Sequence, residues 1–152
     1  DTTPTNFCVG VAGYPEKHPE APNFDSDIRF LKMKIEAGAA YIVTQMFFDN
    51  SRYFDFVNRC REAGINVPII PGIKPITTKA QISVLPTTFH IDIPEELADE
   101  VEKCKDNAAA KEVGITWAVH QSRELIKAGV PTLHFYSMGK SDPIYKIAKE
   151  LF

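Results

Sequence analysis

The sequence has little of several features that would by themselves fix a protein class. Its three cysteines, Cys8, Cys60 and Cys104, are odd in number, widely spaced and without a CxxC pair. We therefore expect reduced, buried thiols of a cytoplasmic protein rather than a disulfide framework. No apolar run approaches the roughly 18 residues of a membrane span, and no charged and then apolar signal segment opens the chain. The net charge of −3 leaves no electrostatic footprint for nucleic acid. We expect neither a membrane nor a nucleic acid as partner.

Common nucleotide-binding and catalytic motifs are missing as well. The chain contains no GxGxxG and no GxxxxGK[ST], so it has neither a dinucleotide fingerprint nor a P-loop. No order of serine, histidine and aspartate suggests a catalytic triad, and His90, His120 and His134 lack the mutual spacing of metal ligands. We expect no metal site.

What is present is a regular alternation of strand-like and helix-like segments, the pattern of a parallel α/β architecture. The 152 residues, 44% of them hydrophobic, are enough for one domain with a real core. Strands are predicted over residues 7–13, 40–45, 67–72 and 132–136. Helices are predicted from a cap at Asp25 or Ser26 to Gly38, over 51–63 and 78–85, from Pro94, and over 108–128 and 143–151.

Four β/α units are half of the eight that a full barrel contains. An open sheet of four parallel strands would have two unpaired edges and one uncovered face. On the first strand, Cys8, Gly10 and Ala12 share one face, and such small residues suit a crowded interior or the close approach of a ligand. Periodicity alone leaves two readings open, a complete small α/β fold or half of a larger barrel.

Polar and aromatic side chains follow each predicted strand, where ligands bind in parallel α/β folds. Gln45 ends an apolar strand, where a side-chain amide needs a hydrogen-bond partner. The proline-rich loop 14–22 could be a rigid turn or a ligand loop, and Lys34 could be an ordinary solvated helix lysine. Lys74 could form a Schiff base, as in an aldolase-like barrel, although nothing nearby in the sequence supports this. The full set after the strands is Tyr14, Glu16, His18, Glu20, Thr44, Gln45, Asp49, Lys74, Gln81, Tyr136, Ser137 and Lys140.

Four segments are together more specific than any one of them: residues 12–21, AGYPEKHPEA, residues 44–49, TQMFFD, residues 68–75, PIIPGIKP, and residues 133–136, LHFY. Together they resemble the methylenetetrahydrofolate reductases. Residues 12–21, AGYPEKHPEA, are similar to that family's AxYPExHPEA loop, and residues 44–49, TQMFFD, to its TQxFFD strand end. Residues 68–75, PIIPGIKP, resemble its IIPGIxP strand, and residues 133–136, LHFY, its final HFY strand. The order and spacing agree over essentially the whole chain, which chance does not explain.

The resemblance implies a flavoprotein with a (β/α)₈ barrel, of which this chain is the second half. Such an enzyme uses FAD to reduce 5,10-methylenetetrahydrofolate to 5-methyltetrahydrofolate with NADH or NADPH. By motif position, the residues implied to contact FAD are Tyr14, His18, Ala21, Asp27 and Lys34. Gln45 is implied to hydrogen-bond the folate pterin, Gln81 to contact the substrate, and Lys140 to meet the folate glutamate carboxylate.

The chain departs from the family pattern at two positions and over one large region. Lys140 stands where many relatives carry arginine, and Leu85 where some carry an aromatic residue. The general-acid glutamate and the flavin-tuning aspartate belong to the first half of the barrel. We therefore assign no catalytic residue here and expect a fragment that is inactive alone.

Two expectations concern assembly. A non-catalytic half-barrel that serves binding or assembly is the alternative to an enzyme fragment. The uncovered sheet of a half-barrel should favour self-association, and the family resemblance implies a homo-oligomer.

Overall fold

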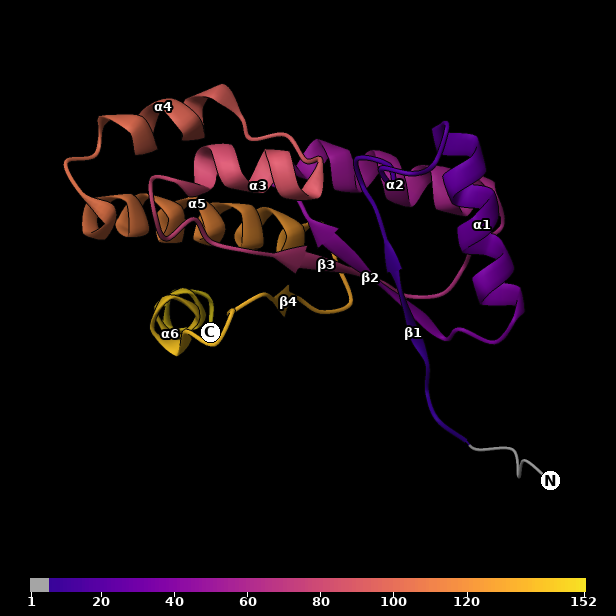
Figure 1. Cartoon of the computed structure of the whole chain (residues 1–152). Helices are drawn as coiled ribbons and strands as arrows, with labels where there is room; N and C mark the ends of the chain where they lie inside the picture. The colour runs from indigo at the N-terminus through magenta and orange to yellow at the C-terminus, as the bar shows by residue number, and fades with distance from the viewer. Residues whose placement is uncertain (1–5) are drawn as a thin grey trace.

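The chain folds into four consecutive β/α units around one parallel sheet (Figure 1). This computed structural model describes residues 6–152. The strands pair in chain order, β1-β2-β3-β4, and every pair is parallel. The predicted α/β class and its four units are therefore confirmed, as a partial α/β barrel. The elements are β1 (Gly10–Gly13), α1 (Phe24–Glu36), β2 (Tyr41–Met46), α2 (Asn50–Glu62), β3 (Ile69–Ile73), α3 (Gln81–Phe89), α4 (Glu95–Lys103), α5 (Asn107–Lys127), β4 (His134–Phe135) and α6 (Ser141–Leu151).

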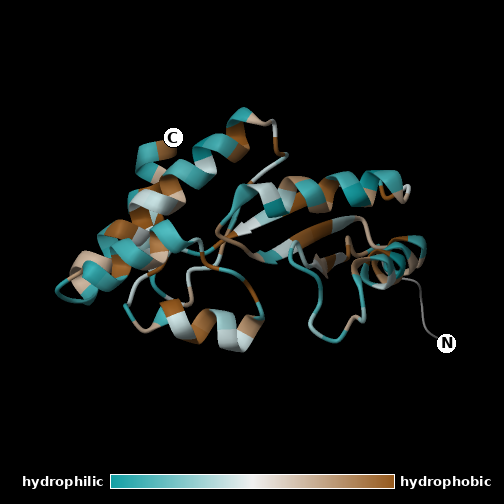
Figure 2. Cartoon of the chain, turned by 90° about the horizontal axis from the view of Figure 1, so that it is seen from above, coloured by the Kyte–Doolittle hydropathy of each residue, from teal (hydrophilic) through white to brown (hydrophobic). Residues whose placement is uncertain are grey.

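One face of the sheet packs against helices α1, α2, α5 and α6. Ile42 of β2 and Ile69 and Ile73 of β3 are at most 1% exposed and share one core with apolar residues of these four helices. The helices alternate hydrophilic and hydrophobic bands along their length (Figure 2), as expected for elements with one buried side. No helix within residues 6–152 is long and apolar enough to cross a membrane.

The opposite face of the sheet is much less covered, and we call it the open face. It carries Gly10 and Ala12 of β1 beside Tyr41 and Val43 of β2, with Gln45 one step further along. The two β1 residues are exposed and the three β2 residues are half-buried. A Cβ on Gly10 would lie 2.3 Å from the ring of Tyr41, so the side chain of the neighbouring strand leaves no room for a larger residue at this position. In a closed barrel this face would line the interior.

Helices α3 and α4 form a second, smaller core with α5 beyond the carboxyl ends of the strands. Its buried residues include Met46, the last residue of β2, Phe48, which follows that strand, and Leu97 and Val101 of α4. In Figure 1 the arrows of β2 and β3 point toward the side of the molecule on which these two helices lie. The chain therefore builds extra structure at the end of the sheet where ligands bind in such folds.

Strand one is shorter than predicted. It begins at Gly10 rather than at residue 7, and Phe7 and Val9 are 81% and 52% exposed. Ala40 donates to the Val9 carbonyl, but β2 begins only at Tyr41, so earlier residues have no neighbour with which to pair. The last strand is likewise shorter, at His134–Phe135.

Two helix starts were predicted wrongly. Helix α1 is capped by Asn23, whose Oδ1 accepts from the Ser26 amide at 2.8 Å, so Asp25 lies inside its first turn. Helix α3 spans Gln81–Phe89 rather than 78–85 and contains Pro86. It continues past the proline and ends at His90, whose left-handed backbone has φ of 53°.

The cysteines are all free, as predicted, but only one is fully buried. Cys60 lies in the main core, Cys104 is half-buried and Cys8 is exposed. Cys8 is exposed because it precedes the shortened strand β1, so the expectation of a buried thiol was wrong there.

Candidate ligand-binding site at the strand ends

The loop after β1 is folded tightly on itself. Lys17 has a positive φ of 74°, and its ammonium donates to the carbonyls of His18, at 2.9 Å, and Ala21. The Tyr14 and His18 rings meet edge to face with centroids 4.5 Å apart. The proline-rich segment 14–22 is thus a rigid turn, and its side chains are held in fixed positions.

Four of the five predicted flavin contacts line one groove between this loop and α1. His18, Ala21, Asp27 and Lys34 surround a hollow of about 520 Å³, together with Glu20, Ala37 and the apolar side chains of Phe30 and Met33. The Asp27 carboxylate accepts from the His18 amide at 2.8 Å and so ties the loop to the helix.

The groove offers a cation beside an apolar wall. Lys34 is exposed and forms no ion pair within the described part of the chain. Tyr14, the fifth predicted contact, does not line the groove but reaches it through the His18 ring. Lys34 would attract a phosphate, and the Phe30 and Met33 side chains would cover part of a bound molecule. The same lining holds two carboxylates, Glu20 and Asp27, and that of Asp27 accepts from the His18 amide.

Gln45 lies at the end of β2 on the open face. Its Oε1 accepts from the adjacent Met46 amide at 2.9 Å. Its amide nitrogen has no hydrogen-bond partner among residues 6–152. Gln45 therefore presents a donor to the space above the sheet.

Threonine and tyrosine side chains tie the neighbouring strand ends together. Thr44 Oγ1 accepts from the Gly72 amide at 2.9 Å, and the Tyr136 hydroxyl donates to the Thr44 carbonyl at 2.8 Å. Burial raises the pKa of Tyr136, and Tyr14 nearby contributes to the increase. The Tyr136 hydroxyl therefore ties the segment after β4 to the end of β2, next to Gln45.

Gln81 and Lys140, both predicted to contact substrate, line one small pocket of about 60 Å³. Gln81 Oε1 accepts from the Thr77 amide at 2.7 Å, which fixes the side chain at the start of α3. Lys74 and Tyr136 line the same pocket. Leu85, the other departure from the family pattern, is only 4% exposed and packs in the core formed with α3 and α4.

Two ionisable groups near the strand ends have shifted pKa values. Glu16 has a pKa raised from 4.5 to about 7, chiefly by burial and despite the hydrogen bond from the Asp92 amide. Burial lowers the pKa of Lys74, and the nearby Lys140 lowers it further. A lysine that loses part of its proton affinity can be a Schiff-base nucleophile. Here, however, no carboxylate or histidine accompanies it in the pocket lining.

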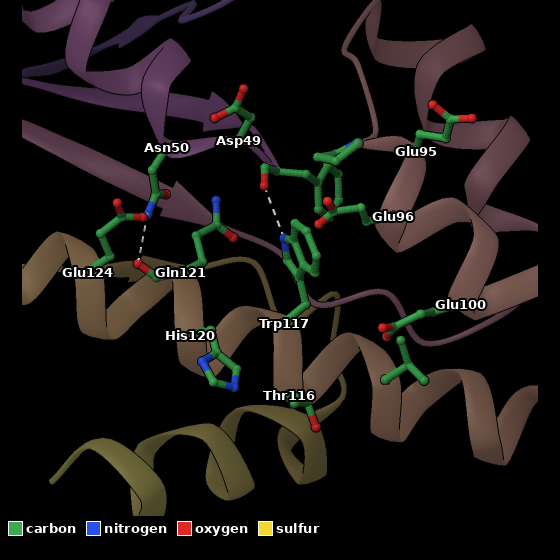
Figure 3. Close-up of a pocket in the computed structure, with 13 residues that line it drawn as sticks. Asp49, Asn50, Glu95, Glu96, Glu100, Thr116, Trp117, His120, Gln121 and Glu124 are labelled. Atoms are coloured by element: carbon green, nitrogen blue, oxygen red, sulfur yellow. Dashed lines mark hydrogen bonds between the residues drawn. The ribbon is translucent and has the colours of Figure 1, made fainter.

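Sequence reasoning missed the residues that hold the end of β2 in place. Trp117 Nε1 of α5 donates to the Phe48 carbonyl at 3.0 Å, and Gln121 Nε2, one turn later, donates to the Phe47 carbonyl at 2.8 Å. Figure 3 shows both in a groove of about 900 Å³ between α4, α5 and the start of α2. A polar glutamine on the buried stripe of α5 was the available signal, because a buried amide needs a partner.

The described residues contain no group of three histidine, cysteine or acidic side chains that could hold a metal ion. Fold and site together define a partial α/β barrel with a polar, ligand-sized site at the carboxyl ends of its strands. The family model for methylenetetrahydrofolate reductase matches residues 2–152. The chain belongs to this family.

Individual relatives agree with the family model. The chain is 38% identical over 147 residues to a probable methylenetetrahydrofolate reductase (NADPH) of Caenorhabditis elegans, covering 95% of this chain and 22% of that protein. It is 37% identical over 147 residues to the 5,10-methylenetetrahydrofolate reductase of Escherichia coli, covering 96% of this chain and 50% of that protein. The chain thus spans half or less of the length of these relatives.

A solved structure shares the fold. It is described as an uncharacterized protein from Clostridium thermocellum that binds two copies of 5-methyl-5,6,7,8-tetrahydrofolic acid. It superposes with a TM-score of 0.64 at 22% identity, covering 93% of this chain and 51% of that one.

Proposed function

We propose that this chain is the C-terminal half of the barrel of a flavin-dependent methylenetetrahydrofolate reductase. The complete enzyme would reduce 5,10-methylenetetrahydrofolate to 5-methyltetrahydrofolate with NADH or NADPH, in the cytoplasm and as part of methionine biosynthesis. The observation that carries the proposal is the grouping of His18, Ala21, Asp27 and Lys34 in one groove. Residues chosen by motif position alone, and spread over 17 positions of sequence, line a single hollow beside the strand ends.

The residues present fit FAD. Lys34 supplies a cation for the pyrophosphate, Asp27 and His18 supply polar atoms, and Phe30 and Met33 supply apolar cover. Tyr14 packs on His18 and fixes its orientation. The flavin, when bound, supplies the hydride chemistry, while the protein binds and orients the reactants.

The folate contacts follow the row of strand ends. Gln45 has a free amide donor on the open face, which suits a hydrogen-bond acceptor on the pterin. Gln81 and Lys140 lie further along, after β3 and β4. Lys140 would bind the glutamate carboxylate as a point charge rather than through a two-pronged contact.

No carboxylate of this chain is proposed as the general acid. Glu16 has a raised pKa but is committed to the Asp92 amide. The acid is proposed to come from the first half of the barrel, so the isolated chain should not turn over substrate. That half would add its strands at the unpaired edges of β1 and β4, and the open face would then line the interior of the closed barrel.

A flavin titration tests the proposal. The chain is titrated with FAD, alone and mixed with a separately expressed first barrel half from the Escherichia coli relative, and flavin absorbance and Trp117 fluorescence are followed. We expect weak or no binding alone and restored binding in the mixture.

Lys34→Met should weaken FAD binding in the mixture by about tenfold, since a phosphate–cation pair contributes roughly 1–2 kcal/mol. Lys32→Met, two positions earlier on α1 and outside the groove, serves as the matched control. If the mixture binds no flavin although both halves are folded, the result would support the alternative that the chain is a non-catalytic binding or assembly module. If the mixtures with Lys34→Met and with Lys32→Met bind FAD equally tightly, Lys34 does not contact the flavin.

A further inference from the structure

The small pocket after β3 and β4 has an unusual balance of charge. Two lysines, Lys74 and Lys140, line it, and none of its ten lining residues is acidic. Its remaining polar groups are hydroxyls and an amide, from Thr77, Gln81, Tyr136 and Ser137. Two cations in one pocket repel each other when no anion lies between them, so an anionic ligand would stabilise this pocket.

Lys74 is the less expected of the two cations, because it is only 7% exposed. Its single hydrogen bond among the described residues is a long one, 3.4 Å, to the carbonyl of Pro75. Buried ammonium groups are normally paired with a carboxylate, because leaving the charge unpaired is destabilising. No ion pair within residues 6–152 involves Lys74.

The nearest acidic residue in the sequence is directed elsewhere. Asp142 follows Lys140 by two positions, but its carboxylate pairs with Lys111 of α5 at 2.9 Å. Helix α6, which starts beside the pocket and contributes Pro143 and Ile144 to it, has no side-chain hydrogen bond at its N-cap. The positive end of its dipole adds to the two lysines.

We propose that Lys74 is a second cation of a carboxylate-binding subsite, which it forms with Lys140 for the glutamate end of the folate. The inference rests on the proposed function for the identity of the ligand. The volume of about 60 Å³ is suited to a carboxylate and excludes a ring. With two cations the subsite selects for a charged tail and against folate analogues whose carboxylates are neutralised.

The test uses a probe that carries the folate tail without the pterin, so that it needs neither flavin nor turnover. The chain, with lysines labelled at the ε-carbon, is titrated with p-aminobenzoyl-L-glutamate and separately with the corresponding diamide, and the lysine ε-CH₂ NMR signals are followed. Lys74→Met assigns the Lys74 signal and retains the length of the side chain. Lys149→Met, on the exposed side of α6, is the control with the same change in charge.

We expect saturable shifts of the Lys74 and Lys140 signals with the dicarboxylate and none with the diamide. Lys74→Met should raise the dissociation constant about fivefold or more, as expected for losing one ion pair, while Lys149→Met leaves it unchanged. The inference is overturned if the probe does not bind, if the diamide binds equally well, or if Lys74→Met has no effect. Tail binding through Lys74, combined with no FAD binding in the mixture of the two barrel halves, would refute the proposed function but not the anion site.

Discussion

The half-buried carboxyl group of Glu16 should make the stability of the chain depend on pH near neutrality. Its Oε2 accepts from the Asp92 amide at 2.6 Å, while its Oε1 is buried without a hydrogen-bond partner among residues 6–152. Burial is the main cause that raises its pKa from 4.5 to about 7. The perturbation we choose is Glu16→Gln, which keeps an oxygen acceptor for Asp92 and removes the charge.

The sign follows from proton binding. Between pH 4.5 and about 7 the folded state binds the proton at Glu16 and the unfolded state does not, so stability falls as pH rises through this window. A shift of this size corresponds to at most about 3 kcal/mol. Because the group is only partly buried, we expect about 1–2 kcal/mol after solvent screening.

The assay is urea unfolding of both chains at intervals between pH 4.5 and pH 8.5. The difference in free energy of unfolding should be near zero at the acid end. It should favour Glu16→Gln by about 1–2 kcal/mol above pH 7.5, equivalent to a melting temperature about 2–8 °C higher. A constant difference across this range would refute the reasoning, because it would mean that Glu16 ionises normally in the folded chain.

Four further outcomes are expected. Gly114→Ala should destabilise the chain by about 2–3 kcal/mol in urea unfolding, because the added Cβ would lie 2.0 Å from the Ile76 carbonyl oxygen; an unchanged midpoint would contradict this contact. Trp117→Phe removes the donor to the Phe48 carbonyl and should cost about 1–2 kcal/mol, whereas retained stability would show that water replaces the indole. For Lys74, whose pKa is lowered from 10.5, the unfolded state binds more protons at alkaline pH, so stability should rise with pH up to about 10.5 and this rise should vanish in Lys74→Met. The open face should make the isolated chain dimerise, and a monomer by light scattering at all concentrations would count against this.

The regular elements could largely be predicted because their signals are local. Strand β2 and helix α2 fall within a residue of their predicted positions, since an apolar run and a capped amphipathic stripe are visible in the sequence. Strand β1 was overextended because its end depends on where β2 begins, which is information from another segment. Helix α1 starts at a cap that was not chosen, because Asn23, Asp25 and Ser26 are all good capping residues.

The candidate site also contains some residues that could be named from the sequence and some contacts that could not. The loop 14–21 carries a dense set of polar residues after a strand, so its residues could be named from sequence. The clamp of Trp117 and Gln121 joins α5 to carbonyls about 70 positions earlier, and the unpaired burial of Lys74 depends on the fold around it. Neither has a local signature strong enough to predict the contact.

These long-range contacts explain how the strand ends hold a constant arrangement in an open sheet. The segment after β2 is fixed from one side by Trp117 and Gln121, and its Thr44 carbonyl from the other by Tyr136. The loop after β1 is fixed by Asp27 and, through Glu16, by the Asp92 amide. Gln45 lies between these supports and contributes only a contact to its own neighbour. The position of its free amide is therefore set by contacts within this chain. A partner that covers the open face would not be needed to hold Gln45 in place.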